Sequence, residues 1–202
     1  MDGLYGQGTR LSGLPASAIR SAPAPTPVHG ARLQTEVDPA RILGLDPGSL
    51  QTGYAVLDCA GGQTCYVASG TVRARGADFP ARLRLIYEGV VALVREYQPT
   101  EVAIERVFMH RNADSALKLG QARGAALCAA FSTTAPVFEY APREVKLAVV
   151  GTGGAQKAQV QLMVRTLLGL RGELSADAAD AIGIALCHAH LRAALRAGRV
   201  GR

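Results

Sequence analysis

Residues 41–74 read RILGLDPGSLQTGYAVLDCAGGQTCYVASGTVRA, and their pattern decides the fold. A short apolar run at 41–46 stops at a Pro-Gly pair, which is typical of a turn. Two runs rich in β-branched and aromatic residues follow at 53–59 and 64–74, with a short Gly-containing link between them. The stretch therefore predicts three consecutive strands with short connections, which is typical of an antiparallel start to a sheet.

Helices and strands alternate after residue 74. Leu83, Ile86 and Val90 recur at three- and four-residue steps, which predicts an amphipathic helix that ends before Pro99. The expected elements are helices at about 79–97 and 114–131 (with Asp114 as N-cap) and strands at 101–107 and 137–142, followed by two or three closing helices at about 143–150, 155–168 and 176–196. Together they predict an α/β fold, with a mixed five-stranded sheet flanked by helices.

Composition separates one folded domain from two tails. Residues 1–40 contain many Pro, Gly and Ala residues and little hydrophobic periodicity, so we expect a disordered N-terminal extension there. The prolines also disfavour the amphipathic helix of a transit peptide. The folded domain is expected at 41–196, and residues 197–202 form a basic C-terminal tail.

The charge distribution points to an anionic partner. The net charge is +6, and residues 1–40 carry as many acidic as basic side chains, so the whole excess lies on residues 41–202. A basic domain favours nucleic acid or another anionic surface. An inert basic surface is the alternative interpretation of the charge alone.

Two further classes of protein are disfavoured. The sequence contains no apolar run long enough to cross a membrane, so no membrane partner is expected. Its cysteines show no C-x-x-C spacing, and we expect reduced core thiols in a cytoplasmic protein. These cysteines are Cys59, Cys65, Cys128 and Cys187.

Two carboxylates fall at strand positions where an acid is informative. Asp46 lies at the end of the first strand, directly before the Pro-Gly pair, where it could also serve only as a turn former. Glu105 lies inside an apolar strand, where burying a carboxylate is costly unless it is paired or bound to a cation. Its neighbour Arg106 points to the opposite side of the strand and is a poor partner.

A second pair of acids begins the last predicted helix. Asp177 and Asp180 are three residues apart and so share one helical face. Acids at a helix start also complement its dipole, which is the simpler interpretation. The helix that follows is almost wholly apolar, so Asp180 is expected against the core, where two acids repel each other unless something neutralises them.

The four acids together predict a site for hard cations. Oxygen ligands select Mg²⁺ or Mn²⁺ over zinc. Two such ions carry out phosphodiester hydrolysis, one activating water and the other stabilising the leaving oxygen. Spacing alone leaves open whether the three segments that hold these acids meet in the fold.

Four stretches carry a resemblance that extends along nearly all of residues 41–190. They are ILGLDPGSLQTGYAVLD, AIERVFMHRNADSALKLGQARGAA, VFEYAPREVKLAVVGTGGAQKAQVQLMVRTLL and ADAADAIGIALCHAH. In these stretches the sequence resembles the RuvC-type Holliday junction resolvases. The resemblance implies a ribonuclease H-like fold, a homodimer, and Mg²⁺-dependent symmetric nicking of two strands at a four-way DNA junction in recombination and repair.

The resemblance also assigns the catalytic residues. It implies that Asp46, Glu105, Asp177 and Asp180 hold two Mg²⁺ ions, for which Mn²⁺ would substitute, although some members of the family have His in place of Asp177. It further implies cleavage within a short T-rich tetranucleotide and a partnership with the RuvA–RuvB branch-migration complex.

Four other residues are candidates for DNA contacts. Lys146 and Lys157 flank a Gly-rich segment that lacks the ending of a P-loop, so its flexibility between basic groups suits phosphate contacts. Phe108 and Arg111 follow the strand of Glu105. On their own these lysines are more often solvated charges and Phe108 a core aromatic, but the resemblance implies DNA contacts for them, with Phe108 stacking on junction bases.

A stripe of small residues predicts a close helix contact. Gly120, Gly124 and Cys128 recur every four residues, which would admit another helix of this chain or of a second subunit. His188 and His190 are more simply explained by burial or exposure than by metal binding.

Three other functions compete with this interpretation of the sequence. The nearest is another ribonuclease H-like nuclease that acts on different nucleic acids. An actin-like ATPase needs two lobes, and residues 41–202 leave room for one. A junction-binding protein without catalysis would gain nothing from acids placed near phosphates.

Overall fold

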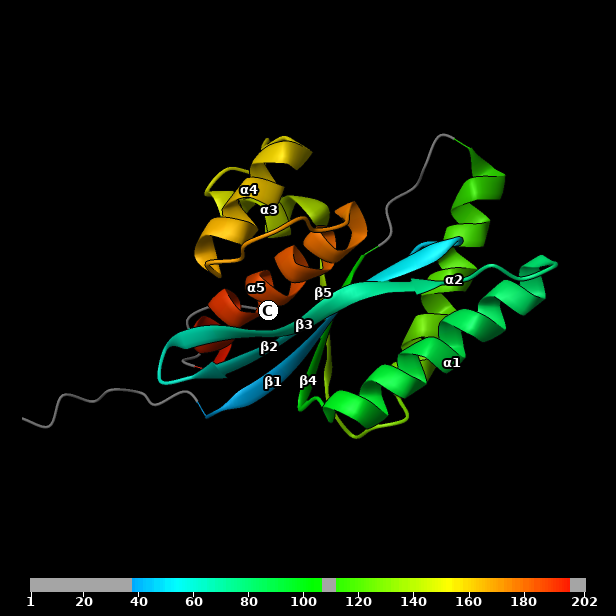
Figure 1. The fold of residues 1–202 in the computed structure, drawn as a ribbon, viewed down its shortest axis with the longest axis horizontal. Helices are drawn as coiled ribbons and strands as arrows, with labels where there is room; N and C mark the ends of the chain where they lie inside the picture. Colours follow the sequence, from blue (N-terminus) through cyan, green and yellow to red (C-terminus); the bar gives the residue numbers. More distant parts are fainter. Residues whose placement is uncertain (1–37, 107–111, 197–202) are drawn as a thin grey trace, which may run out of the picture. The chain divides into compact units, whose positions relative to one another are not determined.

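The described residues form one mixed sheet with helices on both of its faces (Figure 1). The structure is a computed structural model and describes residues 38–106 and 112–196, so Phe108, Arg111 and the tail at 197–202 lie outside the described residues. The elements are β1 (Ala40–Asp46), β2 (Gln51–Ala60), β3 (Gln63–Arg73), α1 (Phe79–Tyr97), β4 (Glu101–Glu105), α2 (Ala113–Ala130), β5 (Val137–Tyr140), α3 (Pro142–Val150), α4 (Lys157–Leu167) and α5 (Ala176–Arg196).

The sheet combines an antiparallel and a parallel half. Its strand order is β3-β2-β1-β4-β5. The pairs β1–β2 and β2–β3 are antiparallel, whereas β1–β4 and β4–β5 are parallel. The predicted α/β architecture with a mixed five-stranded sheet is therefore confirmed. The central strand β1 is covered on both faces, which explains its nearly continuous apolar run.

Two hydrophobic cores lie on the two faces of the sheet. On one face, side chains such as Ile42 and Leu57 pack against α5, with α3 and α4 beside it. On the other face, Leu43 and Val56 pack against α1 and α2. The alternation of the strand residues between faces divides them between the two cores.

Two glycines let α5 approach the sheet closely. A Cβ at Gly44 in β1 would overlap the Ala181 carbonyl of α5, and a Cβ at Gly53 in β2 would overlap the Asp177 carbonyl. The first turns of α5 therefore lie directly against the backbone of β1 and β2. This contact brings the acids of α5 next to the end of β1.

Two predictions about α2 are wrong in detail. The helix begins at Ala113 with Asn112 as N-cap, whose side-chain oxygen accepts from the backbone N–H of Asp114 (3.0 Å). Asp114 therefore lies in the first turn, where it pairs with Lys118 at 2.6 Å. Cys128 is exposed because the side of α2 that carries it faces away from the core, so the expected core thiol is not found there.

The other three cysteines differ in burial. Cys59 and Cys187 are buried, as expected, whereas Cys65 is exposed because it lies on β3, the edge strand of the sheet. Among the described residues, no helix combines the length and apolar character needed to cross a membrane.

Candidate active site

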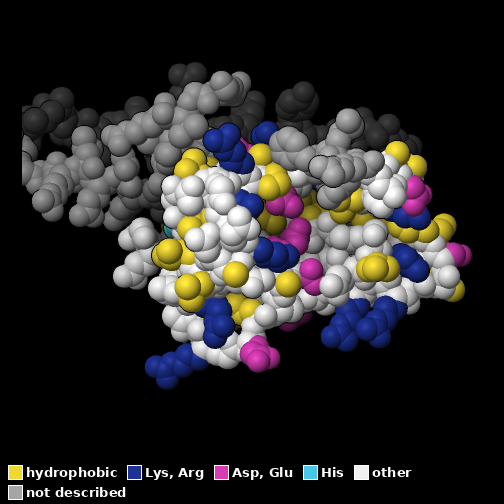
Figure 2. Space-filling model, turned by 90° about the horizontal axis from the view of Figure 1, so that it is seen from above, with side chains coloured by type: hydrophobic (Ala, Val, Ile, Leu, Met, Phe, Trp, Pro, Cys, Tyr) yellow, Lys and Arg dark blue, Asp and Glu magenta, His cyan; other side chains and the backbone are white. Residues whose placement is uncertain are grey.

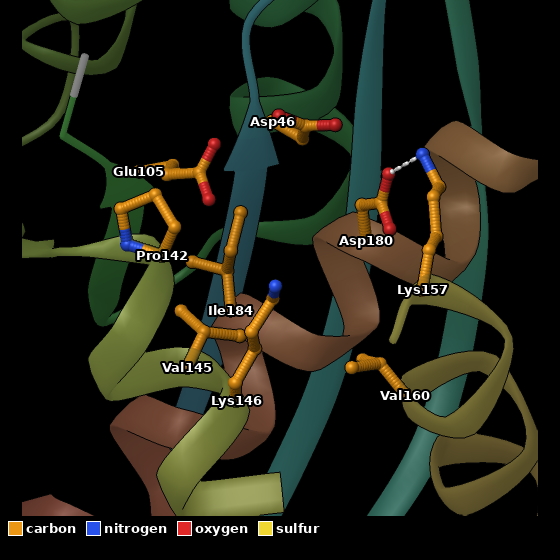
Figure 3. Close-up of a pocket in the computed structure, with 9 residues that line it drawn as sticks. All are labelled: Asp46, Glu105, Pro142, Val145, Lys146, Lys157, Val160, Asp180 and Ile184. Atoms are coloured by element: carbon orange, nitrogen blue, oxygen red, sulfur yellow. Dashed lines mark hydrogen bonds and ion pairs between the residues drawn. The ribbon is translucent and has the colours of Figure 1, made fainter. Parts of the chain in front are cut away.

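The strand order brings Asp46 and Glu105 together at one edge of the sheet. β1 and β4 are parallel neighbours in which Leu45 pairs with Ile104, so the acids that follow these residues lie opposite each other. Because parallel strands end at the same edge, both carboxylates stand at the mouth of the same hollow. This hollow has a volume of about 210 Å³ (Figure 3).

The lining of this hollow, which we call the carboxylate pocket, combines acids, lysines and an apolar wall. Asp46, Glu105 and Asp180 point into it from β1, β4 and α5 (Figure 3). Lys146 of α3 and Lys157 at the start of α4 face them. The remaining lining residues are apolar: Pro142, Val145, Val160 and Ile184. In Figure 2 the acidic side chains gather in the centre of this face, with basic side chains beside them.

Asp177 lies beside the carboxylate pocket and does not line it. Its backbone carbonyl abuts Gly53, and Gly53 is the residue of β2 that pairs with Asp46. The negative charge of Asp177 acts on Asp46, as the pKa of Asp46 records. Three of the four predicted acids therefore share the pocket, and the fourth lies within electrostatic reach.

Asp46 and Glu105 are buried and close enough to other acids to resist ionisation. Burial, and after it the negative charges of Glu105, Asp180 and Asp177, raise the pKa of Asp46 from 3.8 to about 7. Burial and the charge of Asp180 also raise the pKa of Glu105. Carboxylates held in this way favour a bound cation, because a positive charge removes both penalties at once.

Lys157 supplies one positive charge to this cluster. Its Nζ donates to the Asp180 carboxylate at 2.5 Å, and this hydrogen bond raises the pKa of Lys157. The ammonium group occupies a position beside the Asp180 carboxylate that a bound metal cation could otherwise take. Lys157 therefore lies among the acids, as an internal counter-charge, rather than on a separate surface.

The donor set suits a hard cation, although the acids are spread around the pocket. Within residues 38–106 and 112–196, no three Asp, Glu, His or Cys side chains form a ready-made set of metal ligands. The pocket nevertheless offers only carboxylate oxygens, the ligand type that Mg²⁺ and Mn²⁺ prefer. The raised pKa of Asp46 and the ammonium on Asp180 both fit a site that holds positive charge.

The comparison with known families decides the identity of this site. Residues 42–188 match the family described as crossover junction endodeoxyribonuclease RuvC. The chain belongs to this family. It is a nuclease of the hydrolase class, and its sheet and helices form the ribonuclease H-like fold of RuvC.

Individual relatives extend over most of the chain. The RuvC of Methylococcus capsulatus is 58% identical over 155 residues, which cover 77% of this chain and 93% of that protein. The RuvC of Shewanella loihica is 57% identical over 149 residues, covering 74% and 86% respectively. A structure of Thermus thermophilus RuvC in complex with Holliday junction substrate superposes with a TM-score of 0.71 at 34% identity, covering 79% of this chain and 97% of that one.

Sequence reasoning missed Arg123, which fixes the end of β4. Arg123 of α2 donates from Nε to the backbone carbonyl of Glu105 at 3.0 Å. It also forms an ion pair with Glu139 of β5 at 2.9 Å. The available signal was a single arginine in the middle of a helix built mainly of Ala, Gly and Leu.

Sequence reasoning also missed a buried polar network at the far end of β4. Arg192 donates from Nε and Nη2 to the Glu101 carboxylate at 2.9 and 2.8 Å, and His188 Nε2 contacts the same carboxylate at 2.7 Å. The Tyr140 hydroxyl hydrogen-bonds to His188 Nδ1 at 2.6 Å. His188 is fully buried, in agreement with burial as the reason for its presence. The network ties α5 to β4 and β5, and so helps to place Asp180.

The remaining predicted DNA contacts divide into two groups. Lys146 and Lys157 line the carboxylate pocket, next to the acids. Phe108 and Arg111 lie outside the described residues, so their roles stay predictions. His190 hydrogen-bonds through Nδ1 to the Ala148 carbonyl (3.0 Å) and does not line the carboxylate pocket.

Proposed function

We propose that this chain resolves four-way DNA junctions by hydrolysing one phosphodiester in each of two symmetric strands, with Mg²⁺ as cofactor. The observation that carries the proposal is the carboxylate pocket, in which acids from three separate elements face two lysines. The Thermus relative bound to Holliday junction substrate supports the choice of DNA. Because such DNA is chromosomal, we place the protein in the bacterial cytoplasm.

Asp46, Glu105, Asp177 and Asp180 would hold two Mg²⁺ ions, and Mn²⁺ would substitute for them. When bound, such ions activate a water molecule and stabilise the leaving oxygen. The residues of the chain do the rest. Lys146 and Lys157 attract a phosphate toward acids that would otherwise repel it, and the apolar wall below them limits access of water.

Two cuts at one junction call for two active sites, and we propose a homodimer. One helix face supports this proposal. A Cβ added at Gly120 or Gly124 of α2 would meet no other part of the described chain within 4 Å. The side chain of Leu117 on the same helix is 62% exposed.

We also propose that Phe108 and Arg111 contact junction bases and backbone, and that the RuvA–RuvB complex delivers the junction.

The test is a nicking assay on a synthetic four-way junction, with linear duplex and an RNA–DNA hybrid as control substrates. We expect symmetric nicks in Mg²⁺ or Mn²⁺ and none in EDTA. Asp46→Asn should abolish nicking while leaving junction binding intact or tighter, because it removes a negative charge near phosphates. Glu88→Gln, an exposed change on α1, serves as the matched control. Nicking by Asp46→Asn at the wild-type rate, or preferential cutting of the hybrid, would refute the proposal.

The same variant has a readout that does not depend on activity. The folded chain holds Asp46 with its pKa raised to about 7, so its stability without metal falls as the pH rises from about 4 to 7. A neutral Asn removes this penalty. In EDTA at pH 7.5, Asp46→Asn should therefore melt roughly 10 °C above the wild type. A lower melting temperature would show that the acid is not strained.

A further inference from the structure

A second hollow, lined by basic side chains, lies next to β3, the edge strand of the sheet. Arg73 at the end of β3, Arg75 in the loop that follows and Arg82 in the first turns of α1 line it. Its volume is about 430 Å³, larger than that of the carboxylate pocket, and none of its other lining residues carries a charge. We call it the arginine hollow.

The arginines of this hollow lack partners within the part of the chain that the structure describes. Arg73, Arg75 and Arg82 form no ion pair there, and the Nε of Arg82 is buried without a hydrogen-bond acceptor. The acid nearest in sequence, Asp78, uses its Oδ1 to accept from the Ala81 backbone at 2.8 Å as the N-cap of α1. A buried guanidinium N–H without an acceptor is costly, and a ligand oxygen would remove that cost.

The arginine hollow lies at the same end of the strands as the acids of the carboxylate pocket. Across the sheet Asp46 pairs with Gly53, and Gly53 pairs with Thr71, two residues before Arg73. Two strand spacings and two residues along β3 separate Arg73 from Asp46 by roughly 12 Å. The Ala74 backbone N–H donates to the Leu50 carbonyl at 2.9 Å, which ties the hollow to the loop that follows Asp46.

We infer that the arginine hollow binds backbone phosphates of a junction arm, a few nucleotides from the phosphate that is cut. The inference rests on the proposed function and extends its DNA surface. This range follows because roughly 12 Å is longer than one nucleotide step, whose rise along the helix axis is about 3.4 Å, so the contacted phosphate lies beyond the one that is cut. Guanidinium groups match phosphate geometry through paired N–H donors.

The chemistry of the hollow favours backbone over base contacts. It contains no aromatic side chain on which a base could stack. Its contacts would therefore be independent of sequence and would fix the position of the arm. The lysines of the carboxylate pocket come from α3 and α4, on the opposite face of the sheet from α1. The lysines and the arginine hollow would therefore contact the DNA on opposite sides of the cut.

The first experiment measures junction affinity across a NaCl series by fluorescence anisotropy, in EDTA. Arg73 and Arg75 are exposed, so Arg73→Ala/Arg75→Ala should fold normally. We expect the log–log salt slope to fall by about 2, since each lost phosphate contact removes about 0.9, with affinity at least tenfold weaker at 100 mM. The matched control is Arg84→Ala/Arg95→Ala, which removes two exposed arginines of α1 that line neither hollow. Equal slopes for the two double variants overturn the inference.

The second experiment locates the contact on the DNA. Junctions carry one neutral methylphosphonate at one of the first five steps from the cut. At the contacted step the modification should weaken binding of the wild type but have little further effect on Arg73→Ala/Arg75→Ala, because both changes remove the same interaction. Equal weakening of both proteins at every step overturns the inference.

Nicking in Mg²⁺ by the wild type separates this result from the proposed function. If the wild type does not nick, the proposed function fails, and the salt slopes still decide whether the hollow binds DNA. If the wild type nicks and the two double variants have equal salt slopes, the proposed function stands and only the inference about the arginine hollow fails. Arg82→Gln, which removes the buried Nε, should reduce the slope in the same direction if the hollow binds phosphate.

Discussion

Replacing Glu101 with Gln tests whether the buried network holds the RuvC-type fold together. Glu101 is 5% exposed and accepts from Arg192 and His188. Glu101→Gln keeps the shape of the side chain but leaves the Arg192 guanidinium, itself 4% exposed, without its counter-charge. Removing one partner of a buried pair is costly because the other charge stays buried.

The size of the effect follows from proton affinity. Burial alone would raise the pKa of Glu101, but the hydrogen bonds and positive charge of Arg192 and His188 outweigh it and lower the pKa from 4.5 to about 2. Each tenfold change in proton affinity corresponds to about 1.4 kcal/mol. The ionised carboxylate therefore contributes about 3 kcal/mol to the free energy of unfolding at pH 7, and its loss should lower the melting temperature by about 10 °C.

The sign of the pH dependence is also fixed. Because the pKa is lowered on folding, the contribution is complete above the unfolded value of 4.5 and is lost as the pH falls toward 2. The difference between wild type and Glu101→Gln should therefore stay constant from pH 7 to about 5. It should shrink steadily below that pH and nearly vanish near pH 2.

Urea denaturation followed by circular dichroism at several pH values measures this difference. Glu88→Gln, which changes an exposed glutamate of α1, is the control and should stay within about 0.5 kcal/mol of the wild type. The reasoning fails if Glu101→Gln is as stable as the control at pH 7. It also fails if the destabilisation persists unchanged at pH 2.5.

Two further predictions concern DNA contacts and chain length. Lys157→Ala should weaken junction binding and lower the salt slope by about 1, whereas Phe108→Ala should leave the slope unchanged and impair nicking at equal occupancy; equal slopes for both variants would contradict this division. If Phe108→Ala unfolds the protein instead, Phe108 is a core aromatic. A chain that begins at Asp38, whose carbonyl accepts from Arg192 at 3.0 Å, should keep its melting temperature and nicking activity, and loss of either would show that residues 1–37 are structural.

Much of the fold was readable from the sequence because strand and helix periods are local properties. The antiparallel start, the five strands and the five helices were all found, with ends that agree or differ by one or two residues. The errors arose where a neighbouring residue competed for the same role. Asn112 caps α2 in place of Asp114, since its side chain reaches the N–H groups of Asp114 and Ser115.

The candidate site was harder to predict because it depends on which elements meet. The acids were identified individually, but their convergence depends on the parallel pairing of β1 with β4 and on the close approach of α5 at Gly44 and Gly53. Neither the pairing partner of a strand nor the distance between a helix and the sheet can be read from a local sequence pattern. Arg123 and the Glu101 network were missed for the same reason, since their partners lie 18 and about 90 residues away along the chain.

The two glutamates of β4 show how environment separates a structural acid from a functional one. Glu101 and Glu105 begin and end the same five-residue strand. Burial raises the proton affinity of both, but Arg192 and His188 reverse the effect at Glu101, whereas the nearby Asp180 reinforces it at Glu105. Glu101 is therefore satisfied within the chain, whereas the raised pKa of Glu105 fits the metal-binding role proposed for it. Helix α5 carries His188 and Arg192, which bind Glu101, and also Asp180, which lies near Glu105. The buried contacts that hold α5 at one end of β4 therefore also help to place Asp180 at the other end.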